Sequence, residues 1–347
     1  MRTPDVFIKG IGLFVPPVVD VDSAVEQGLV SAEKAATLTG AGAAVAGDTP
    51  APEMALTAAR QALERAGHEP SEVDLMLYSG SWHQGPDGWL PHSYLQHHLV
   101  GGKTPSMAVN QGCNSTFGAL ELAHAYLGAA PERRTALLVA SDNFGTPLVD
   151  RWNCSPGAFL GDGASAIVVS RDEGFARVLA MASTTVAEAE ELHRAGEPLF
   201  PPGVTTATPI DFGVRGGAFQ RQLITSGVGV AVWLEVQKQM AAVIGQVTDE
   251  AGVKIDDVAR ISFTVLAGEM FEQPCLAAVG MTPEQSTSRF SRGLGHLGSS
   301  DQFVAFEHLL STGELKPGDH MLLHGMGPGI TLSCALVRVE SIPPWLS

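Results

Sequence analysis

The sequence has no uninterrupted apolar run of about 18 residues, the length that a membrane-spanning helix needs. Its N-terminal stretch, MRTPDVFIKGIGLFVPP, lacks the long apolar core and the cleavage site of a signal peptide. The four cysteines form no CxxC pair and no Cys/His cluster, which argues against a disulfide scaffold and against a zinc site. These absences predict a cytoplasmic protein without a bound metal.

Positive charge is scarce as well. The chain has 21 Lys and Arg against 37 Asp and Glu, a formal net charge of -16 that disfavours binding to nucleic acid or to an anionic membrane surface. An acidic partner would therefore need a local basic patch. With 45% hydrophobic and 17% charged residues, the composition is that of a folded, core-rich protein. The length of 347 residues accommodates one large domain or two of ordinary size.

Short apolar runs alternate with longer helical patterns, which predicts an α/β fold built of layers. The predicted strands are residues 6–14, 74–79, 106–110, 135–141, 164–169, 177–182, 259–266, 320–324 and 330–339. The predicted helices are residues 52–66, 91–99, 114–129, 227–251, 269–279 and 300–311. Residues 191–222 are rich in Pro and Gly, and we interpret them as a functional loop or cap, not as a domain linker.

Two parts of the chain resemble each other in the order of their elements. SEVDLMLYSGS, from Ser71, resembles DDVARISFTVLAG, from Asp256. The helix after Cys113 with PERRTALLVASDNFG resembles the helix from Ser300 with KPGDHMLLHGMGPG, and each runs from a Gly-rich turn through a helix to a strand. This order predicts two similar halves, residues 1–172 and 173–347.

Cys113 lies in SMAVNQGCNSTFGALELAHAYL, at a turn between an apolar run and a long helical pattern. A helix N-terminus favours negative charge, so this position would favour the nucleophilic thiolate. Asn114, Ser115 and Thr116 are candidate helix caps. The alternative is a small buried hydrophobic residue, which is what most free cysteines are.

The corresponding turn of the second half, GLGHLGSSD, contains His296 and Asp301. If the halves pack about a pseudo-twofold axis, the two turns meet. Cys113, His296 and Asp301 would then form the nucleophile, base and orienting carboxylate of covalent acyl transfer. Taken singly, His296 is better explained as a structural loop histidine, and Asp301 as a carboxylate stabilised at a helix N-terminus; their joint occurrence in corresponding turns favours the catalytic interpretation.

Two further glycine-rich turns have different interpretations. HGMGPG, residues 324–329, ends a predicted strand and could present backbone N–H groups to an oxyanion, whereas for the His324 side chain we favour a packing role. GDGASA, residues 161–166, lacks the phosphate-loop pattern, so we favour a structural role for it.

The Cys113 helix, FLGDGASAIVV and the closing KPGDHMLLHGMGPGITLSCALVRV together resemble the ketoacyl-acyl carrier protein synthase III family of the thiolase superfamily. The likeness extends over essentially the whole chain. It implies a five-layered αβαβα sandwich, normally a homodimer, in which the cysteine is acylated at the buried end of a substrate tunnel. No cofactor is implied beyond the phosphopantetheine arm of the acyl donor.

The chain departs from the condensing members of that family at two positions. Those members stabilise the enolate of a decarboxylating malonyl thioester with a histidine, in a His-Gln-Ala-Asn stretch, and an asparagine. Here the first position falls near residues 266–268, which contain no histidine, and the second is His296. The remaining Cys113, His296 and Asp301 resemble a branch of antibiotic-pathway acyltransferases. That branch moves an acyl group, or an aryl group such as 6-methylsalicylyl, from a carrier to a sugar or cyclitol hydroxyl or to another carrier.

The kind of acyl donor is predicted from two residues that this chain lacks. Members that use coenzyme A hold its adenine with a Trp and an Arg, and the matching SAEKAATLTGAGAA has neither, which favours a donor bound to an acyl carrier protein. The helix that is usually basic where it meets the acidic carrier here reads EMFEQP, which weakens the docking argument. The nearest basic candidates, each of which reads equally well as a solvated surface charge, are Lys103, Arg215, Arg221 and Lys238.

The oxyanion donor and the acyl site also follow from the resemblance. The residue that normally donates its N–H aligns with Pro328, which has none. The resemblance therefore assigns this role mainly to Cys113, aided by Gly327 or Gly329, unless the alignment is shifted by one residue. The loop SWHQGPDGWLPH matches the region that lines the acyl tunnel across the dimer. Its Trp82, His83 and Trp89 would suit a flat aryl or short branched acyl group, or would serve as ordinary core or interface residues.

The first hypothesis for the function is acyl transfer without condensation, from an acyl carrier protein to Cys113 and then to a small-molecule hydroxyl that His296 deprotonates. The second is a starter-unit condensing synthase that tolerates His296 in place of asparagine. The third is a non-catalytic partner subunit of a synthase complex. The intact nucleophile turn argues against the third, because a silent subunit does not need a polarised cysteine.

Overall fold

The computed structural model describes residues 1–3, 5–38 and 40–346. Nine strands among these residues form one sheet, in the order β5-β4-β6-β7-β1-β8-β11-β10-β9. The strands are β1 Phe7–Phe14, β4 Leu75–Ser79, β5 Ser106–Val109, β6 Thr135–Asp142, β7 Gly163–Ser170, β8 Ala176–Thr185, β9 Val258–Ser262, β10 His320–Gly327 and β11 Thr331–Val339. A separate antiparallel pair is formed by β2 Val18–Asp20 and β3 Gly42–Ala44.

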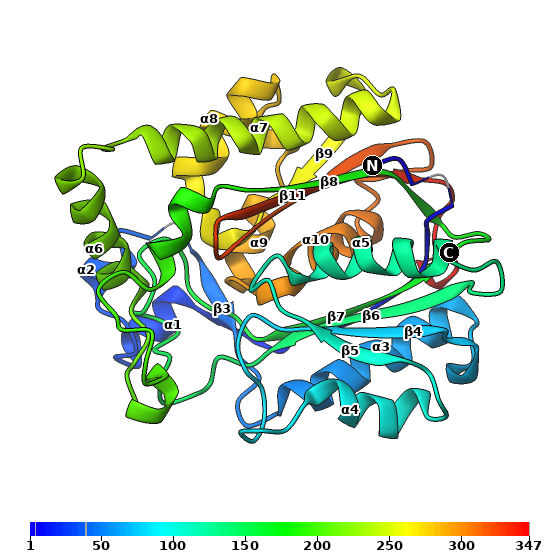
Figure 1. The fold of residues 1–347 in the computed structure, drawn as a ribbon, viewed down its shortest axis with the longest axis horizontal. Helices are drawn as coiled ribbons and strands as arrows, with labels where there is room; N and C mark the ends of the chain where they lie inside the picture. The colour runs from blue at the N-terminus through cyan, green and yellow to red at the C-terminus, as the bar shows by residue number, and fades with distance from the viewer. Residues whose placement is uncertain (4, 39, 347) are drawn as a thin grey trace.

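The helices are arranged on the sheet in layers (Figure 1). They are α1 Val21–Glu26, α2 Ala32–Ala35, α3 Ala51–Ala66, α4 Pro91–Leu95, α5 Ser115–Gly128, α6 Phe212–Thr225, α7 Ala231–Ala251, α8 Gly268–Val279, α9 Ser288–Leu294 and α10 Asp301–Ser311. Helices α3 and α4 cover one outer face, α7 and α8 cover the other, and α5 and α10 lie in the middle. The sheet is nearly interrupted between β1 and β8, which pair only through Phe7–Arg177 and Ile8–Ala176. The arrangement is thus helix, sheet, helix, sheet, helix, as the resemblance implied.

The middle helices are buried on nearly all sides, which explains their unusual apolar content. Phe117 and Leu120 of α5 and Phe303 and Phe306 of α10 belong to one hydrophobic cluster with residues of both sheet portions. A helix that is apolar around most of its circumference is expected between two sheets. Strand β6 is likewise buried along its whole length because helices cover both of its faces.

Several predicted elements differ in extent from the observed ones. The predicted strand 259–266 ends at Ser262, and a short 3-10 turn, Val265–Ala267, follows. The predicted helix 227–251 begins only at Ala231, because Gly227 and Gly229 both have a positive φ. Helix α6, which was not predicted, begins within the predicted cap and extends three residues beyond it. The proposed division near residue 172 stays a prediction, although β8–β11 all follow it. No helix among the described residues is long and apolar enough to cross a membrane.

Candidate active site

The Cys113 turn connects β5 to α5 and depends on a glycine. Gly112 has φ +55°, and a Cβ atom there would lie 2.4 Å from Cδ of Pro328 in the β10–β11 turn. Of the candidate caps, Ser115 holds the turn, since its Oγ accepts from the N–H of Gln111 at 2.7 Å and donates to the carbonyl of Gly112 at 2.6 Å. This geometry places Cys113 immediately before the first turn of α5, as predicted.

The two turns that the repeat paired meet in the structure. Oγ of Thr116 donates to the carbonyl of Ser299 at 2.7 Å, and Oγ of Ser299 donates to the carbonyl of Gly112 at 2.8 Å. These reciprocal bonds fix the N-terminal end of α5 against the segment that precedes α10. The expectation that the two turns approach each other is therefore confirmed.

Cys113, His296 and Asp301 form a continuous hydrogen-bonded line. Nε2 of His296 lies 2.8 Å from Sγ of Cys113, and Nδ1 of His296 lies 2.7 Å from Oδ2 of Asp301. His296 and Asp301 are buried, at 1% and 3% exposure, whereas Cys113 is partly accessible. A buried carboxylate on the far side of the ring fixes its orientation and favours the N–H tautomer at Nδ1.

The protonation of His296 is set by opposing influences. Burial by itself lowers the pKa of His296, but the negative charges of Asp301 and of the Cys113 thiolate, with their hydrogen bonds, raise this pKa well above its ordinary value. The resting site therefore favours a protonated His296 ring beside Cys113.

Asp301 is held in place by backbone donors from two segments. Its Oδ1 accepts from the N–H of Leu297 at 2.7 Å, and its Oδ2 accepts from the N–H of Val265 at 2.8 Å. Asp301 is also the first residue of α10, so the helix terminus favours its negative charge. Its two interpretations, as a helix-terminal carboxylate and as the partner of His296, are thus both correct.

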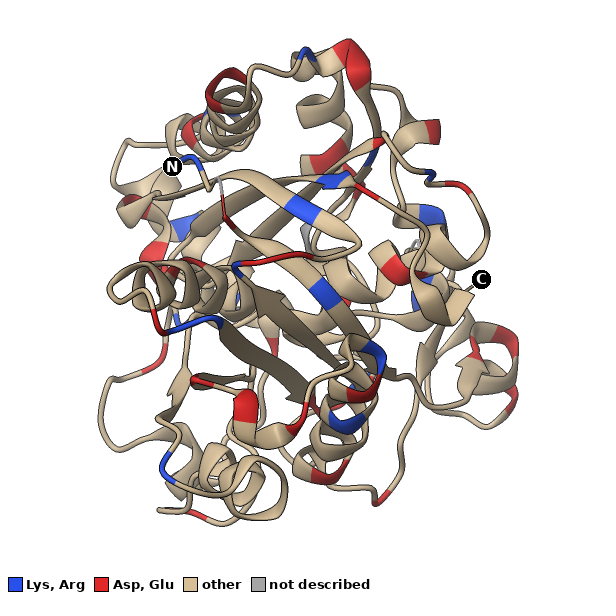
Figure 2. Ribbon diagram, turned by 90° about the vertical axis from the view of Figure 1, so that its right-hand side faces the viewer, with Lys and Arg blue, Asp and Glu red and all other residues tan. Residues whose placement is uncertain are grey.

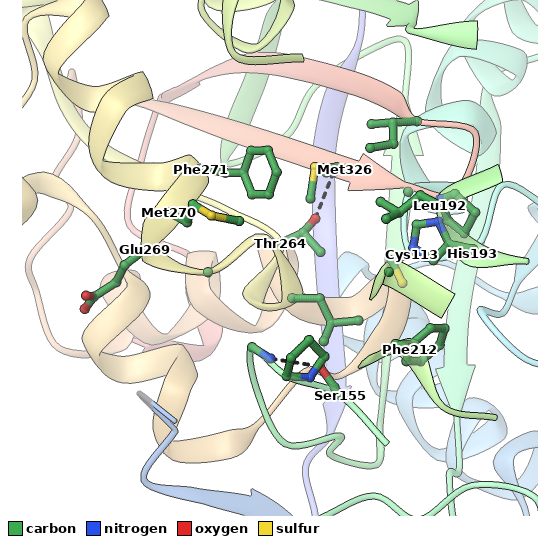
Figure 3. A pocket seen from close by; sticks show the side chains of 18 of the residues that line it. Cys113, Ser155, Leu192, His193, Phe212, Thr264, Glu269, Met270, Phe271 and Met326 are labelled. Carbon is green, nitrogen blue, oxygen red and sulfur yellow. Dashed lines mark hydrogen bonds between the residues drawn. The ribbon is translucent and has the colours of Figure 1, made fainter. Parts of the chain in front are cut away.

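A cavity of about 500 Å³ opens beside Cys113, within the size range of small-molecule sites (Figure 3). Its wall is mostly apolar and aromatic, and includes Leu192, Phe212, Trp233, Leu266, Met270, Phe271, Met326 and Ile330. The polar side chains in the wall are fewer and include Thr37, Ser155, His193, Thr264 and Glu269. The cavity is thus suited to a largely apolar group attached to Sγ.

Residues of the predicted cap form part of this wall. Leu192, His193 and Phe212 reach the cavity from the segment that we interpreted as a functional loop or cap. His193 was not singled out by the sequence, because a lone histidine in a Pro- and Gly-rich segment has no recognisable pattern. Burial, and then the charge of Arg215, lower the pKa of His193 to about 4.

The predicted acyl-site residues lie elsewhere in the single chain. Trp82 and His83 line a separate hollow of about 470 Å³, together with Asp87 and Asn143. Trp89 packs edge-on against Tyr94, with ring centroids 5.9 Å apart. None of the three residues lines the cavity beside Cys113 within the chain. Their role in an acyl tunnel across a dimer stays a prediction.

The β10–β11 turn lies against Cys113. The two glycines predicted to assist Cys113 as N–H donors, Gly327 and Gly329, differ in position. Gly327 and Pro328 line the cavity, and a Cβ at Gly327 would lie 2.5 Å from the carbonyl oxygen of Gln111. Gly329 lies further along the turn, with φ +118°. Gly327 is therefore the better placed of the two glycines to assist Cys113, and the oxyanion role itself stays a prediction.

Two structural interpretations agree with the observed packing. His324 is fully buried, with its ring 5.2 Å from that of Phe263, and burial lowers its pKa to about 4. In the GDGASA turn, Asp162 accepts two hydrogen bonds of 2.9 Å from Arg151 and another of 2.8 Å from the N–H of Phe144. His324 and Asp162 are thus buried residues with a structural role.

The basic candidates do not gather at the cavity. Figure 2 shows Lys and Arg at scattered positions with acidic residues among them. Arg215 is paired with Glu197 at 2.6 Å, and Lys238 lies 3.4 Å from Glu235. Among the residues that the structure describes, these two candidates are thus already engaged by carboxylates.

Comparison with known proteins places these observations in context. Residues 107–186 match the family model for 3-oxoacyl-[acyl-carrier-protein] synthase III, and residues 248–339 match the model for its C-terminal part. The chain is 50% identical to a solved structure of ChlB3, described as an acyltransferase, with a TM-score of 0.93 and coverage of 99% of this chain and 100% of that one.

More distant relatives are similar in sequence or in structure. The β-ketoacyl-[acyl-carrier-protein] synthase III of Erythrobacter litoralis is 26% identical over 295 residues, covering 82% of this chain and 83% of that protein. The 3-oxoacyl-[acyl-carrier-protein] synthase III of Aquifex aeolicus is 22% identical, with a TM-score of 0.76 and coverage of 96% of this chain and 99% of that one. At that identity, the second likeness supports the fold alone.

Proposed function

Because the chain belongs to the 3-oxoacyl-acyl carrier protein synthase III family of the thiolase superfamily, we propose that it is an acyltransferase that works through Cys113. It takes an acyl group, aryl groups included, from the thioester of an acyl carrier protein. It passes this group to a hydroxyl of a natural-product intermediate or to a second carrier. The observation that carries the proposal is the 2.8 Å separation of Nε2 of His296 from Sγ of Cys113, with Asp301 on the other ring nitrogen.

In the first half-reaction, the Cys113 thiolate attacks the carbonyl carbon of the donor thioester. The bond from this carbon to the sulfur of the phosphopantetheine arm breaks, and the His296 imidazolium gives its proton to the departing thiolate. The acyl group is then bonded to Sγ, and His296 is neutral. N–H groups of Cys113 and Gly327 are the proposed donors to the transient oxyanion.

In the second half-reaction, neutral His296 accepts the proton of the acceptor hydroxyl as its oxygen attacks the acyl carbon. The bond from this carbon to Sγ breaks, and the ester of the acceptor is released. Cys113 returns as thiolate and His296 as imidazolium, so protons and charges balance over the cycle. Asp301 stabilises the imidazolium in both steps.

Condensing members have a histidine in a segment whose counterpart in this chain has none, and this difference favours acyl transfer over condensation. In this chain, Leu266 and Gly268 of that segment line the cavity, and the asparagine position is His296. The pair of residues that would stabilise an enolate is therefore replaced by a general base for an alcohol.

The proposal includes a homodimer in the cytoplasm. Strand β5 is at the edge of the sheet, and its Met107 is 44% exposed, which leaves a strand with unpaired backbone groups for a second copy. In such a dimer, the hollow that holds Trp82 and His83 would lie close to the partner's cavity, as the family resemblance implies.

The test begins with the purified protein and an acyl carrier protein loaded with an aryl group. We expect the intact mass of the protein to rise by one acyl group, with Cys113→Ala as the unreactive control. The acyl-enzyme should then lose its acyl group to an added alcohol. The His296→Ala variant should retain part of the self-acylation and lose transfer to the alcohol.

Three outcomes would contradict the proposal. Release of carbon dioxide and formation of a ketoacyl product on addition of malonyl carrier would identify a condensing synthase. Absence of any acyl adduct on Cys113 would favour the non-catalytic partner subunit. Full retention of alcohol transfer in His296→Ala would remove His296 from the mechanism.

A further inference from the structure

A second imidazole faces the substrate cavity and has no part in the triad. His193 belongs to the cap segment, and Figure 3 shows it beside Cys113, among the apolar side chains of Leu192 and Phe212. Nδ1 of His193 is buried and has no hydrogen-bond partner among the described residues. Because Nδ1 is closed off from solvent, a ligand in the cavity meets this ring through Nε2.

The position of this ring is fixed by its neighbours. The carbonyl of His193 accepts a hydrogen bond from Nη1 of Arg215 at 2.9 Å, and Arg215 is itself held by Glu197 at 2.6 and 2.9 Å. The His193 ring packs edge-on against Phe212, at 5.9 Å between centroids and 78° between planes. The imidazole is therefore presented to the cavity by a network that does not use its ring nitrogens.

The charge state of His193 restricts what it can bind. Burial and the nearby Arg215 keep the ring neutral at pH 7, because they lower its pKa to about 4. A neutral imidazole has one N–H donor and one acceptor nitrogen. It therefore matches a neutral group that both donates and accepts, which a hydroxyl does, and has no charge to attract a carboxylate.

We propose that His193 is a specificity residue that hydrogen-bonds a hydroxyl carried by the acyl group on Cys113, so that the preferred donors are hydroxylated acyl thioesters. This inference rests on the proposed acyl transfer. The acyl group is the part of the substrate that is attached to Sγ, and the cavity beside Sγ is the one that His193 lines. The remaining wall, with Phe212, Trp233 and Phe271, accommodates the apolar body of such a group.

The experiment measures self-acylation alone, so that the acceptor does not contribute. The probes are the N-acetylcysteamine thioesters of benzoic acid and of 2-, 3- and 4-hydroxybenzoic acid, and the readout is the rate of mass gain on Cys113. We expect the wild-type protein to react at least about tenfold faster with one hydroxyl isomer than with the benzoyl probe, because a site with a buried polar group rejects a ligand that leaves it unpaired.

Three variants identify the source of this preference. His193→Phe should react with the benzoyl probe at a rate within about threefold of wild type and should lose the preference for the hydroxyl isomer. His193→Gln, which can still hydrogen-bond, should retain part of it. His320→Phe, at the first residue of β10 and outside the cavity lining, should retain all of it and is the matched control. The melting temperature of each variant is measured alongside.

The outcomes separate this inference from the proposed function. Acylation by every probe at similar rates, or a preference that survives in His193→Phe, would overturn the role of His193 and leave acyl transfer intact. Loss of the preference in His320→Phe as well would also overturn it. Absence of acylation by any probe and by the same acyl groups loaded on an acyl carrier protein, with Cys113 still reactive toward iodoacetamide, would overturn both proposals.

Discussion

The backbone N–H of Val265 donates to Oδ2 of Asp301 at 2.8 Å, and the same oxygen lies 2.7 Å from Nδ1 of His296. Val265 directly precedes residues 266–268, where the family resemblance places a histidine in condensing members. In this chain, that stretch has no histidine, and the backbone beside it holds the carboxylate of Asp301.

Replacing Asp301 by Asn should slow acylation of Cys113 by about 100-fold or more, because the amide cannot stabilise the imidazolium and reverses the preference at Nδ1. The rate of mass gain with an acyl donor measures this. The Asp257→Asn variant, at an exposed site directly before β9, is the control and should react as wild type does. An Asp301→Asn enzyme with wild-type rates would contradict the assigned role of Asp301.

A Gly298→Ala variant should lose about 2 kcal/mol or more of unfolding free energy. Gly298 has φ +62°, and an added Cβ would lie 2.0 Å from Oδ2 of Asp142 and 2.7 Å from Oγ of Ser81. Because Gly298 lies between His296 and Asp301, acylation should slow as well. The matched control is Gly293→Ala, where an added Cβ meets open space and stability should change little or rise. Urea denaturation compares the variants, and equal losses would refute the argument.

Iodoacetamide at neutral pH should modify the native protein at Cys113 alone. Burial raises the pKa of Cys154 and of Cys275 to about 12, and raises that of Cys334 well above its ordinary value. Intact-mass measurement should show one adduct in the native protein, none in Cys113→Ser, and four after unfolding, since all four cysteines are free. Modification of a second cysteine in the folded protein would be evidence against this packing.

Folding stability should fall between pH 6.5 and pH 4 partly because of His324. Burial lowers its pKa from the ordinary 6.5 to about 4, so over this interval the unfolded chain binds a proton that the folded chain does not. The associated stability is complete above pH 6.5 and is lost as the pH falls toward 4. Protonation of His193 changes the folding stability in the same direction, because its pKa is lowered as well. Melting temperatures at pH 7 and pH 5 should therefore differ less in His324→Phe than in wild type, and an unchanged difference would count against the argument.

Much of the fold could be predicted from the sequence because its strands are continuous apolar runs and its long helices have clear boundaries. The buried strands β6 and β7 and the helices α3, α5 and α10 all lie close to their predicted positions. Helix α6 was missed because Gly213, Gly216 and Gly217 suppress its helical pattern. The short elements α1, α2, β2 and β3 lack enough residues for a period to be recognised.

The triad could be predicted because it lies on two glycine-rich turns at corresponding places in a repeat. His193 could not, since only the tertiary fold shows that its ring reaches the cavity, with Nδ1 unpartnered. The sequence also could not show that Trp82 and His83 line a hollow separate from the Cys113 cavity, because residue type does not determine which cavity a side chain faces.

The hydrogen bond between Cys113 and His296 joins residues 183 positions apart, one before the helix α5 and the other just before α10. During synthesis, the nucleophile leaves the ribosome well before its base exists. Until strands β8 to β11 and α10 have packed against α5, the thiol has no imidazole beside it. Pairing of Cys113 with His296 thus requires that the last layers of the sandwich are assembled.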